Sequence, residues 1–181
     1  MAISKFRFKN IVVSGDIGTG TTTLAKRLAS KLNWQYLSAG DFFRAYHKEH
    51  NLPLWNKAAI PDKIERKIDY EFLNKMRKES EIVFDAHYAG WFARNLKNVF
   101  RILLLTDKKV AAERILSRKH THKETVEEIE ERRSQLRDKF EKLYSSDNYE
   151  DPKYFHLTID TTKTGIEDAI LSAYKKFLNN A

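Results

Sequence analysis

The residues best suited to chemistry form a stretch rich in glycine and threonine near the start of the chain. It reads GDIGTGTTT and runs from Gly15 to Thr23. Glycines let a backbone wrap closely around an anion, and the N–H groups of such a loop attract negative charge, as does the N-terminus of a following helix. A β-branched run from Ile11 to Val13 precedes the loop, and Leu24, Leu28 and Leu32 follow it at helical spacing. This order of strand, loop and helix predicts a site for nucleotide phosphates.

The loop nearly matches the pattern G-x-x-x-x-G-K-[ST], with one departure. Thr22 stands where a hydroxyl binds Mg²⁺, but Thr21 occupies the lysine position. A lysine there places positive charge between the outer phosphates, whereas threonine donates one hydrogen bond and carries no charge. Asp16 also adds an acid to the loop. The residues expected to hold the phosphates are Gly15, Asp16, Gly18, Thr19, Gly20, Thr21, Thr22 and Thr23; the alternative is a glycine-rich turn that binds nothing.

The composition bounds the class of protein. The chain has 181 residues, of which 41% are hydrophobic, and this favours one domain with a proper core. It has no cysteine, which excludes disulfides and thiolate metal sites and is compatible with a reducing cytosol, so a cytoplasmic location is expected. The basic N-terminus lacks the apolar core of a signal peptide, and no apolar run approaches the roughly 20 residues that span a bilayer. No membrane partner is therefore expected.

The charge balance indicates anionic partners. Lys and Arg total 33 against 25 Asp and Glu, for a net charge of +8. Small phosphorylated nucleotides and nucleic acid both fit such a balance. The basic residues are dispersed among acids, and no nucleic-acid-binding motif is present. We therefore expect small nucleotides as partners and do not expect specific binding of a nucleic acid. We expect a monomer.

Strands and helices alternate along the chain. The expected strands are 11–13, 34–37, 82–84, 100–105 and 155–159, and the main helices are 22–32, 42–50, 62–79, 107–118, a helix ending near 144, and 166–178. This alternation predicts a parallel sheet with helices on both faces, whose ligands bind beyond the carboxyl ends of the strands. Asp85 ends an apolar strand, the place for a carboxylate that orients hydrated Mg²⁺ together with Thr22; a helix cap or turn is the alternative. Asp62 and Glu65 suggest a capping box for helix 62–79.

Several segments resemble the short, archaeal-type cytidylate kinases, which are nucleoside monophosphate kinases. The segments are the loop with its helix (GDIGTGTTTLAKRLA), SAGDFFR at 38–44, IERKID at 64–69, AGW at 89–91, AERILSR at 112–118, EIEER at 128–132 and TIDTTK at 158–163. The resemblance implies a single domain over 1–181 with the three-layer α/β P-loop NTPase fold: a five-stranded parallel sheet, a mobile acceptor-binding segment at about 38–80 and a mobile lid at about 114–140. It implies Mg²⁺-dependent phosphoryl transfer from ATP to CMP or dCMP.

On the acceptor side, the resemblance implies roles for five residues. Arg44 would grip the acceptor phosphate, since a guanidinium fork suits phosphate oxygens. Asp69 would read the base and its amino group, with Arg66 in support. His87 stands where the family has a second arginine; as an imidazolium it would partly replace that charge, with activity rising as the pH falls through about 6.5. Lys139 would face the phosphates from the lid.

On the donor side, the resemblance assigns the lid arginines. Arg114 and Arg118, four residues apart, are expected on one helical face, covering adenine and reaching the donor phosphates. Arg132 would face the same phosphates, with Arg137 turned aside unless the helix bends. The expected catalytic set is Arg114, Arg118, Arg132, Arg137 and Asp85. Solvated arginines paired with nearby glutamates are the alternative.

Two missing cations, at Thr21 and His87, leave the activity open to three interpretations. The expected one is an active kinase in which Arg114, Arg118 or Arg132 compensates for the lysine. The others are a related P-loop kinase with another small acceptor and a non-catalytic, regulatory nucleotide-binding protein. A final feature is the H-x-H at His120 and His122; as a metal site it needs two more ligands, and a polar lid loop is the alternative.

Overall fold

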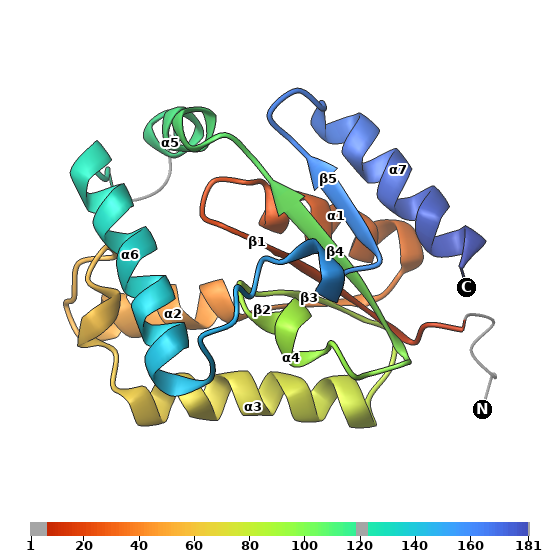
Figure 1. The fold of residues 1–181 in the computed structure, drawn as a ribbon, viewed down its shortest axis with the longest axis horizontal. Coiled ribbons are helices and arrows are strands. Elements are labelled where there is room, and N and C mark those ends of the chain that lie inside the picture. The colour runs from red at the N-terminus through yellow and green to blue at the C-terminus, as the bar shows by residue number, and fades with distance from the viewer. Residues whose placement is uncertain (1–6, 119–122, 181) are drawn as a thin grey trace.

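The computed structural model describes residues 7–118 and 123–180 and contains a five-stranded parallel sheet. The strands lie in the order β2-β3-β1-β4-β5, with the strand that precedes the glycine-rich loop in the centre (Figure 1). Their bounds are β1 Asn10–Gly15, β2 Gln35–Ser38, β3 Ile82–Asp85, β4 Val99–Leu105 and β5 Leu157–Asp160. The expected fold class is confirmed, and all five expected strands are present within two residues of their predicted bounds.

Helices cover both faces of the sheet (Figure 1). The helices are α1 Thr21–Leu32, α2 Ala39–Glu49, α3 Asp62–Lys78, α4 Ala89–Phe92, α5 Lys108–Leu116, α6 Val126–Leu143 and α7 Ile166–Asn179, with 3₁₀ turns at Lys57–Ala59 and Pro152–Tyr154. Ile11 and Val13 of β1 pack with α1 and α7, whereas Val12 between them packs with α3 and α4. This alternation explains the apolar run in β1, because successive side chains of a strand point to opposite faces.

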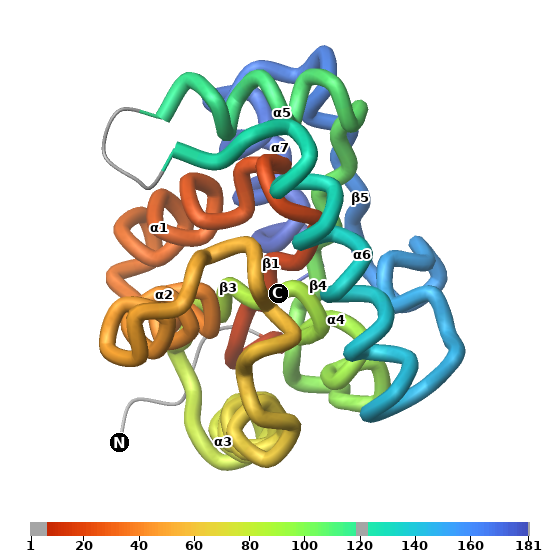
Figure 2. Tube along the Cα trace, turned by 90° about the vertical axis from the view of Figure 1, so that its left-hand side faces the viewer, coloured from red at the N-terminus to blue at the C-terminus, as the bar shows by residue number. Residues whose placement is uncertain are grey.

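The helix α6 lies outside these layers, beside the carboxyl ends of the strands. In Figure 2 it extends from beside α5 to beside α4. Ile129, Leu136 and Phe140 of α6 pack against an aromatic group that includes Tyr88 and Trp91. A capping box between Thr125 and Glu128 starts the helix. This packing brings the polar face of α6 close to the glycine-rich loop.

The predicted capping box at the start of α3 is wrong. The N-cap of α3 is Pro61, which has no side chain that can accept a hydrogen bond. Glu65 is fully buried and forms ion pairs with two lysines, so tertiary contacts take the side chain that a capping box would use. The sequence also missed the short helix α4 and both 3₁₀ turns, which have too few residues for a periodic pattern. Within the described residues, no helix has the length and apolar character needed to cross a membrane.

Candidate active site

The loop between β1 and α1 is held in shape by close approaches that require glycine. Gly18 has φ +80°, and a Cβ there would lie 2.6 Å from the carbonyl oxygen of Ala111 in α5. A Cβ on Gly15 would lie 2.5 Å from the carbonyl oxygen of Leu104 in β4. The Thr19 hydroxyl donates to the Asp16 carbonyl oxygen at 2.7 Å and closes the turn. The loop is therefore clamped between β4 and α5.

Thr22 and Asp85 meet at the base of this loop. The Thr22 hydroxyl donates to Asp85 Oδ2 at 2.7 Å, and the Tyr36 hydroxyl donates to the same oxygen at 3.1 Å. Burial raises the pKa of Tyr36, so it remains a donor at neutral pH. Asp85 is adjacent because β1 and β3 pair with Val13 opposite Asp85. The structure thus brings together the hydroxyl and the carboxylate that the sequence predicted as partners.

This pair is suited to Mg²⁺. In the described part of the chain, no group of three or more His, Cys, Asp or Glu side chains could hold a metal ion by itself. Mg²⁺ commonly uses one or two protein oxygens and completes its shell with water and substrate phosphates. Thr22 and Asp85 are hard oxygen donors at a phosphate-binding loop, so the residues present fit this mode.

A cavity of about 320 Å³, which we call the phosphate cavity, opens in front of the loop. It gathers residues from the loop, the end of β3, α2, α6 and the segment that follows α5. Its lining residues are Asp16, Ile17, Gly18, Gly20, Thr21, Thr22, Thr23, Gly40, Arg44, Leu54, Asp85, Ala86, His87, Arg118 and Arg132. Gly15 and Thr19, the other two predicted loop residues, lie behind this surface and shape it.

The three arginines of the phosphate cavity differ in what they pair with. Arg44 forms an ion pair with Asp41 at 2.5 Å, and Arg132 contacts the buried Glu124 at 3.1 and 3.2 Å. Arg118 forms no hydrogen bond or ion pair with another described side chain. Burial and the nearby Arg132 lower the pKa of Arg118, with Arg44 contributing, whereas Glu124 acts in the opposite direction. A bound polyanion would relieve the repulsion between these arginines.

His87 lines the phosphate cavity but does not carry the charge that the sequence suggested. Its Nδ1 lies 2.8 Å from the Gly15 carbonyl oxygen, so this nitrogen is the donor. Burial lowers the pKa of His87, although Asp16 and the Gly15 carbonyl act in the opposite direction. The neutral ring is therefore the form at neutral pH, and the proposed imidazolium substitute for an arginine is disfavoured.

Five predicted site residues lie outside the phosphate cavity: Arg66, Asp69, Arg114, Arg137 and Lys139. Arg114 donates to the Thr161 carbonyl oxygen at 2.6 Å and to its hydroxyl at 3.2 Å. The expectation that Arg114 and Arg118 share a helical face is wrong, because α5 ends at Leu116 and Arg118 follows the helix. Arg137 lines a separate hollow beside Tyr149 and Glu150 and does not reach the loop.

The remaining three residues belong to the contact between α3 and α6. Arg66 is exposed and lies 3.4 Å from the Leu143 carbonyl oxygen. Lys139 is buried, lies 3.3 Å from Glu65 Oε2 and donates to the Ile60 carbonyl oxygen, so α3 and the segment just before it hold its ammonium group. Asp69 accepts a hydrogen bond from the Tyr144 hydroxyl at 2.7 Å. In this arrangement neither Lys139 nor Asp69 is available to a nucleotide.

This buried group is completed by Lys57 and Tyr144, which the sequence did not single out. Lys57 lies 2.6 Å from Glu65 Oε1, and Glu65 is thereby shared between Lys57 and Lys139. Burial, with Glu65 contributing, raises the pKa of Asp69 to about 7. We call Lys57, Glu65, Asp69, Lys139 and Tyr144 the junction cluster, because it joins the segment 38–80 to α6.

The sequence also missed Arg133 and Glu124. Arg133 Nε lies 2.8 Å from Asp16 Oδ2, so the acid that the loop carries is paired. The double arginine at 132–133 was the available signal, but only the fold decides which of the two faces the loop. His120 and His122 lie outside the described residues.

A glycine-rich loop that leads into α1, the paired Thr22 and Asp85, and a parallel sheet with β1 at its centre define a P-loop kinase fold. A family model described as "AAA domain" matches residues 11–138. The cytidylate kinase of Sulfolobus acidocaldarius is 35% identical over 162 residues, covering 87% of this chain and 88% of that protein. The cytidylate kinase of Ignicoccus hospitalis is 33% identical over 93% of this chain and 98% of that protein.

The chain belongs to the cytidylate kinase family of P-loop nucleoside monophosphate kinases. The family expected from the sequence is thus confirmed. Among solved structures, a gluconokinase from Sinorhizobium meliloti 1021 superimposes with a TM-score of 0.66 over 97% of this chain and 94% of that chain. Its identity of 16% makes this a likeness of fold alone.

Proposed function

We propose that the chain catalyses Mg²⁺-dependent phosphoryl transfer from ATP to CMP or dCMP, giving ADP and CDP or dCDP. The observation that carries the proposal is the contact of Thr22 with Asp85 at 2.7 Å, inside a cavity that also holds Arg44, Arg118 and Arg132. The family supports a nucleoside monophosphate as acceptor. The choice of the cytidine base rests on the names of the relatives.

In this proposal the loop from Gly15 to Thr23 holds the ATP phosphates with its N–H groups and threonine hydroxyls. Thr22 and Asp85 would hold Mg²⁺, and the ion would neutralise negative charge on the ATP phosphates. An oxygen of the acceptor phosphate attacks the γ-phosphorus while ADP leaves. Arg44 and His87 both line the phosphate cavity, and in this proposal they contact the acceptor phosphate.

Arg118 takes the place of the missing loop lysine in this account. Its guanidinium faces the phosphate cavity and has no described side chain as a partner, so binding ATP breaks no existing ion pair. Arg132 must be shared with the buried Glu124, and Arg114 is held by Thr161. Of the three candidates for compensation, Arg118 therefore costs least to recruit.

The acceptor base is the least constrained part of the site. Asp69, the residue that the family resemblance assigns to the base, is buried and occupied by Tyr144. Reading of a cytosine amino group by Asp69 would require Tyr144 to move away. We therefore propose that Asp69 contacts the base only in the nucleotide-bound state. This proposal requires that the segment 38–80 and the lid, about residues 114–140, move when the nucleotide binds.

A coupled ADP-release assay with ATP, Mg²⁺ and CMP, dCMP, UMP or AMP tests this function. The proposal predicts turnover that depends on the acceptor, is fastest with CMP or dCMP and is abolished by EDTA. Turnover with none of the four acceptors would overturn the proposal, and nucleotide binding without turnover would favour the regulatory interpretation. The monomeric state and cytoplasmic location stay predictions, which light scattering and cell fractionation would check.

A further inference from the structure

Asp16 presents a problem for a loop that binds phosphates. Its carboxylate lines the phosphate cavity, and the loop has Thr21 instead of a lysine. An unpaired carboxylate at this point would repel phosphate oxygens in a partly buried site, where charges are poorly screened. Another group must offset this charge if the loop is to receive a triphosphate.

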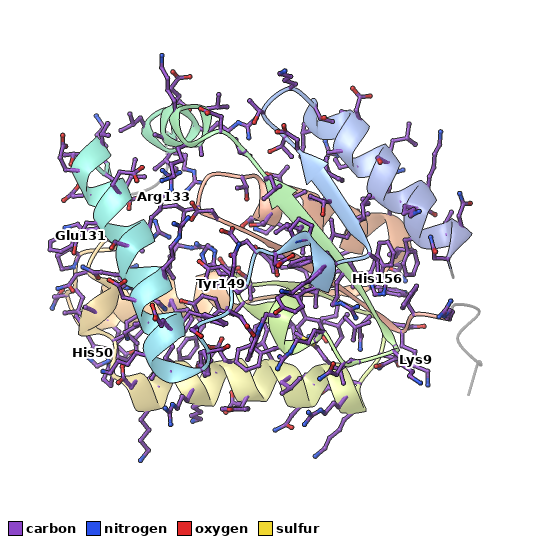
Figure 3. The ribbon with its side chains drawn as sticks, viewed as in Figure 1. Lys9, His50, Glu131, Arg133, Tyr149 and His156 are labelled. Carbon is purple, nitrogen blue, oxygen red and sulfur yellow. The ribbon has the colours of Figure 1, made fainter. Side chains whose placement is uncertain are left out.

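Arg133 of α6 supplies that group. Its Nε lies 2.8 Å from Asp16 Oδ2, and its side chain is only 4% exposed, against 18% for Asp16. The other carboxylate oxygen, Oδ1, accepts the N–H of Ile17 at 2.7 Å. In Figure 3 Arg133 lies on the side of α6 that faces the loop, whereas Glu131 points away from it. One oxygen of Asp16 thus accepts a backbone hydrogen bond, and the other lies at ion-pair distance from Arg133.

The Arg133 guanidinium is held in place by more than this one contact. One terminal nitrogen pairs with Glu130 on α6, and the other lies 3.5 Å from the Ile17 carbonyl oxygen. The neighbouring Arg132 turns to Glu124 and the phosphate cavity. Two adjacent arginines therefore face different groups: Arg132 lines the phosphate cavity and pairs with Glu124, and Arg133 is committed to the loop.

We infer that Arg133 is a positioning residue of the donor site, which acts through Asp16 and does not touch the nucleotide. It cancels the negative charge of Asp16 and fixes the loop in a shape that can receive the triphosphate. It also makes donor binding depend on the docking of α6 against the loop. The inference rests on the proposed function in that it takes ATP as the donor.

A mutant cycle read by calorimetric titration of MgATP tests the inference. Arg133→Met leaves the Asp16 charge unpaired, so the dissociation constant for MgATP should rise about tenfold or more. Asp16→Asn removes the acid and should tighten MgATP binding about threefold.

Two further variants test rescue. The double variant Asp16→Asn/Arg133→Met should regain most of the lost affinity, and Arg133→Lys should keep most of the wild-type affinity. In turnover, Arg133→Met should raise the KM for ATP more than it lowers kcat.

An ordinary structural role would give a different pattern. If Arg133 only anchors α6, then Asp16→Asn will not restore MgATP binding in the Arg133→Met background, and this would overturn the inference. Should Arg133→Met fail to fold, weaker MgATP binding by Asp16→Asn alone would contradict the inference equally. The exposed pair Arg27–Glu167, at 3.0 Å, is the matched control, and Arg27→Met should leave MgATP affinity unchanged.

The MgATP titration needs no acceptor nucleotide, so it tests the role of Arg133 independently of the proposed kinase activity. Absence of acceptor-dependent turnover would overturn the proposed function while leaving the cycle readable. Failure of the double variant to recover MgATP affinity, in an otherwise active kinase, would overturn the role of Arg133 alone.

Discussion

The phosphate cavity and the junction cluster are both rich in charged side chains, but they treat charge in opposite ways. In the phosphate cavity Arg118 has no described partner, and the nearby Arg132 helps to lower its pKa. In the junction cluster Glu65 is fully buried and shared between Lys57 and Lys139. In the first region a cation remains without an ion pair to a described side chain, whereas the second region pairs its charges internally.

This contrast offers a criterion that separates cations that bind a ligand from cations that support the fold. A buried charge needs partners, because its desolvation is costly. A cation that lines a cavity and has no protein partner can form an ion pair with a ligand without first breaking another. By this criterion we propose Arg118 for the chemistry, whereas Lys139, which the family resemblance placed at the phosphates, pairs with Glu65 of the segment 38–80.

The largest effect on stability should come from breaking the junction cluster. Glu65→Gln leaves Lys57 and Lys139 buried without their counter-charge, so the free energy of unfolding should fall by about 3–5 kcal/mol. Denaturant unfolding measures this loss. Glu71→Gln is the control on the same helix, because its pair with Lys67 is exposed and 3.9 Å long, and it should cost less than about 1 kcal/mol. A similar small cost for Glu65→Gln would mean that the junction cluster does not support the fold.

At the phosphate cavity, the main effect of a substitution should be on turnover and not on stability. Asp85→Ala removes the carboxylate that accepts from Thr22 and Tyr36, and turnover should fall by about a hundredfold to a thousandfold. Steady-state assays at several Mg²⁺ concentrations would measure this change. Asp160→Ala, which changes the exposed acid that ends β5, is the matched control and should retain activity. Equal losses in the two variants would argue against a metal site at Asp85.

The sequence predicted the features that depend on residues close together in the chain or on the ends of strands, and it missed other contacts between residues far apart in the chain. The loop, its flanking strand and helix, and the meeting of Thr22 with Asp85 follow from local patterns and from the rule on strand ends. The pairing of Lys139 with Glu65 joins residues 74 positions apart, and no local pattern carries it. Glu65 shows the same limit, since a residue suited to a capping box became a buried ion-pair partner.

The lid arginines show a second limit. Helical spacing placed Arg114 and Arg118 together, but the end of α5 at Leu116 separates them. Arg132 and Arg133 are adjacent and chemically identical, and only the docking of α6 gives one to the phosphate cavity and the other to Asp16. The sequence thus predicted where cations gather, but not which of them have protein partners.

A smaller effect should appear in the pH dependence of stability. Burial, with Glu65 contributing, raises the pKa of Asp69 from 3.8 to about 7, so the native carboxyl keeps a proton that the unfolded chain has lost. Its contribution to stability is fully present below about pH 4 and is lost as the pH rises through 7. The stability of the wild type relative to Asp69→Asn should therefore fall by about 1.4 kcal/mol per pH unit between pH 5 and 6.5.

Denaturant unfolding of both proteins across this range measures that difference. The comparison with Asp69→Asn removes the opposing effect of His47, His87 and His156, whose pKa values burial lowers. These histidines destabilise the native state as the pH falls below about 6.5 in both proteins alike. A difference that does not change with pH would show that Asp69 is ionised in the native state.

Turnover of Thr21→Lys, Arg118→Met and the double variant tests whether Arg118 replaces the lysine that the loop lacks. If Arg118 supplies the positive charge that the loop lacks, Arg118→Met should lower kcat at least about tenfold, and Thr21→Lys should restore most of that loss in the double variant. Thr21→Lys alone should change turnover less than about tenfold, because the charge is already present. A rise above tenfold for Thr21→Lys alone, or no rescue in the double variant, would contradict the account.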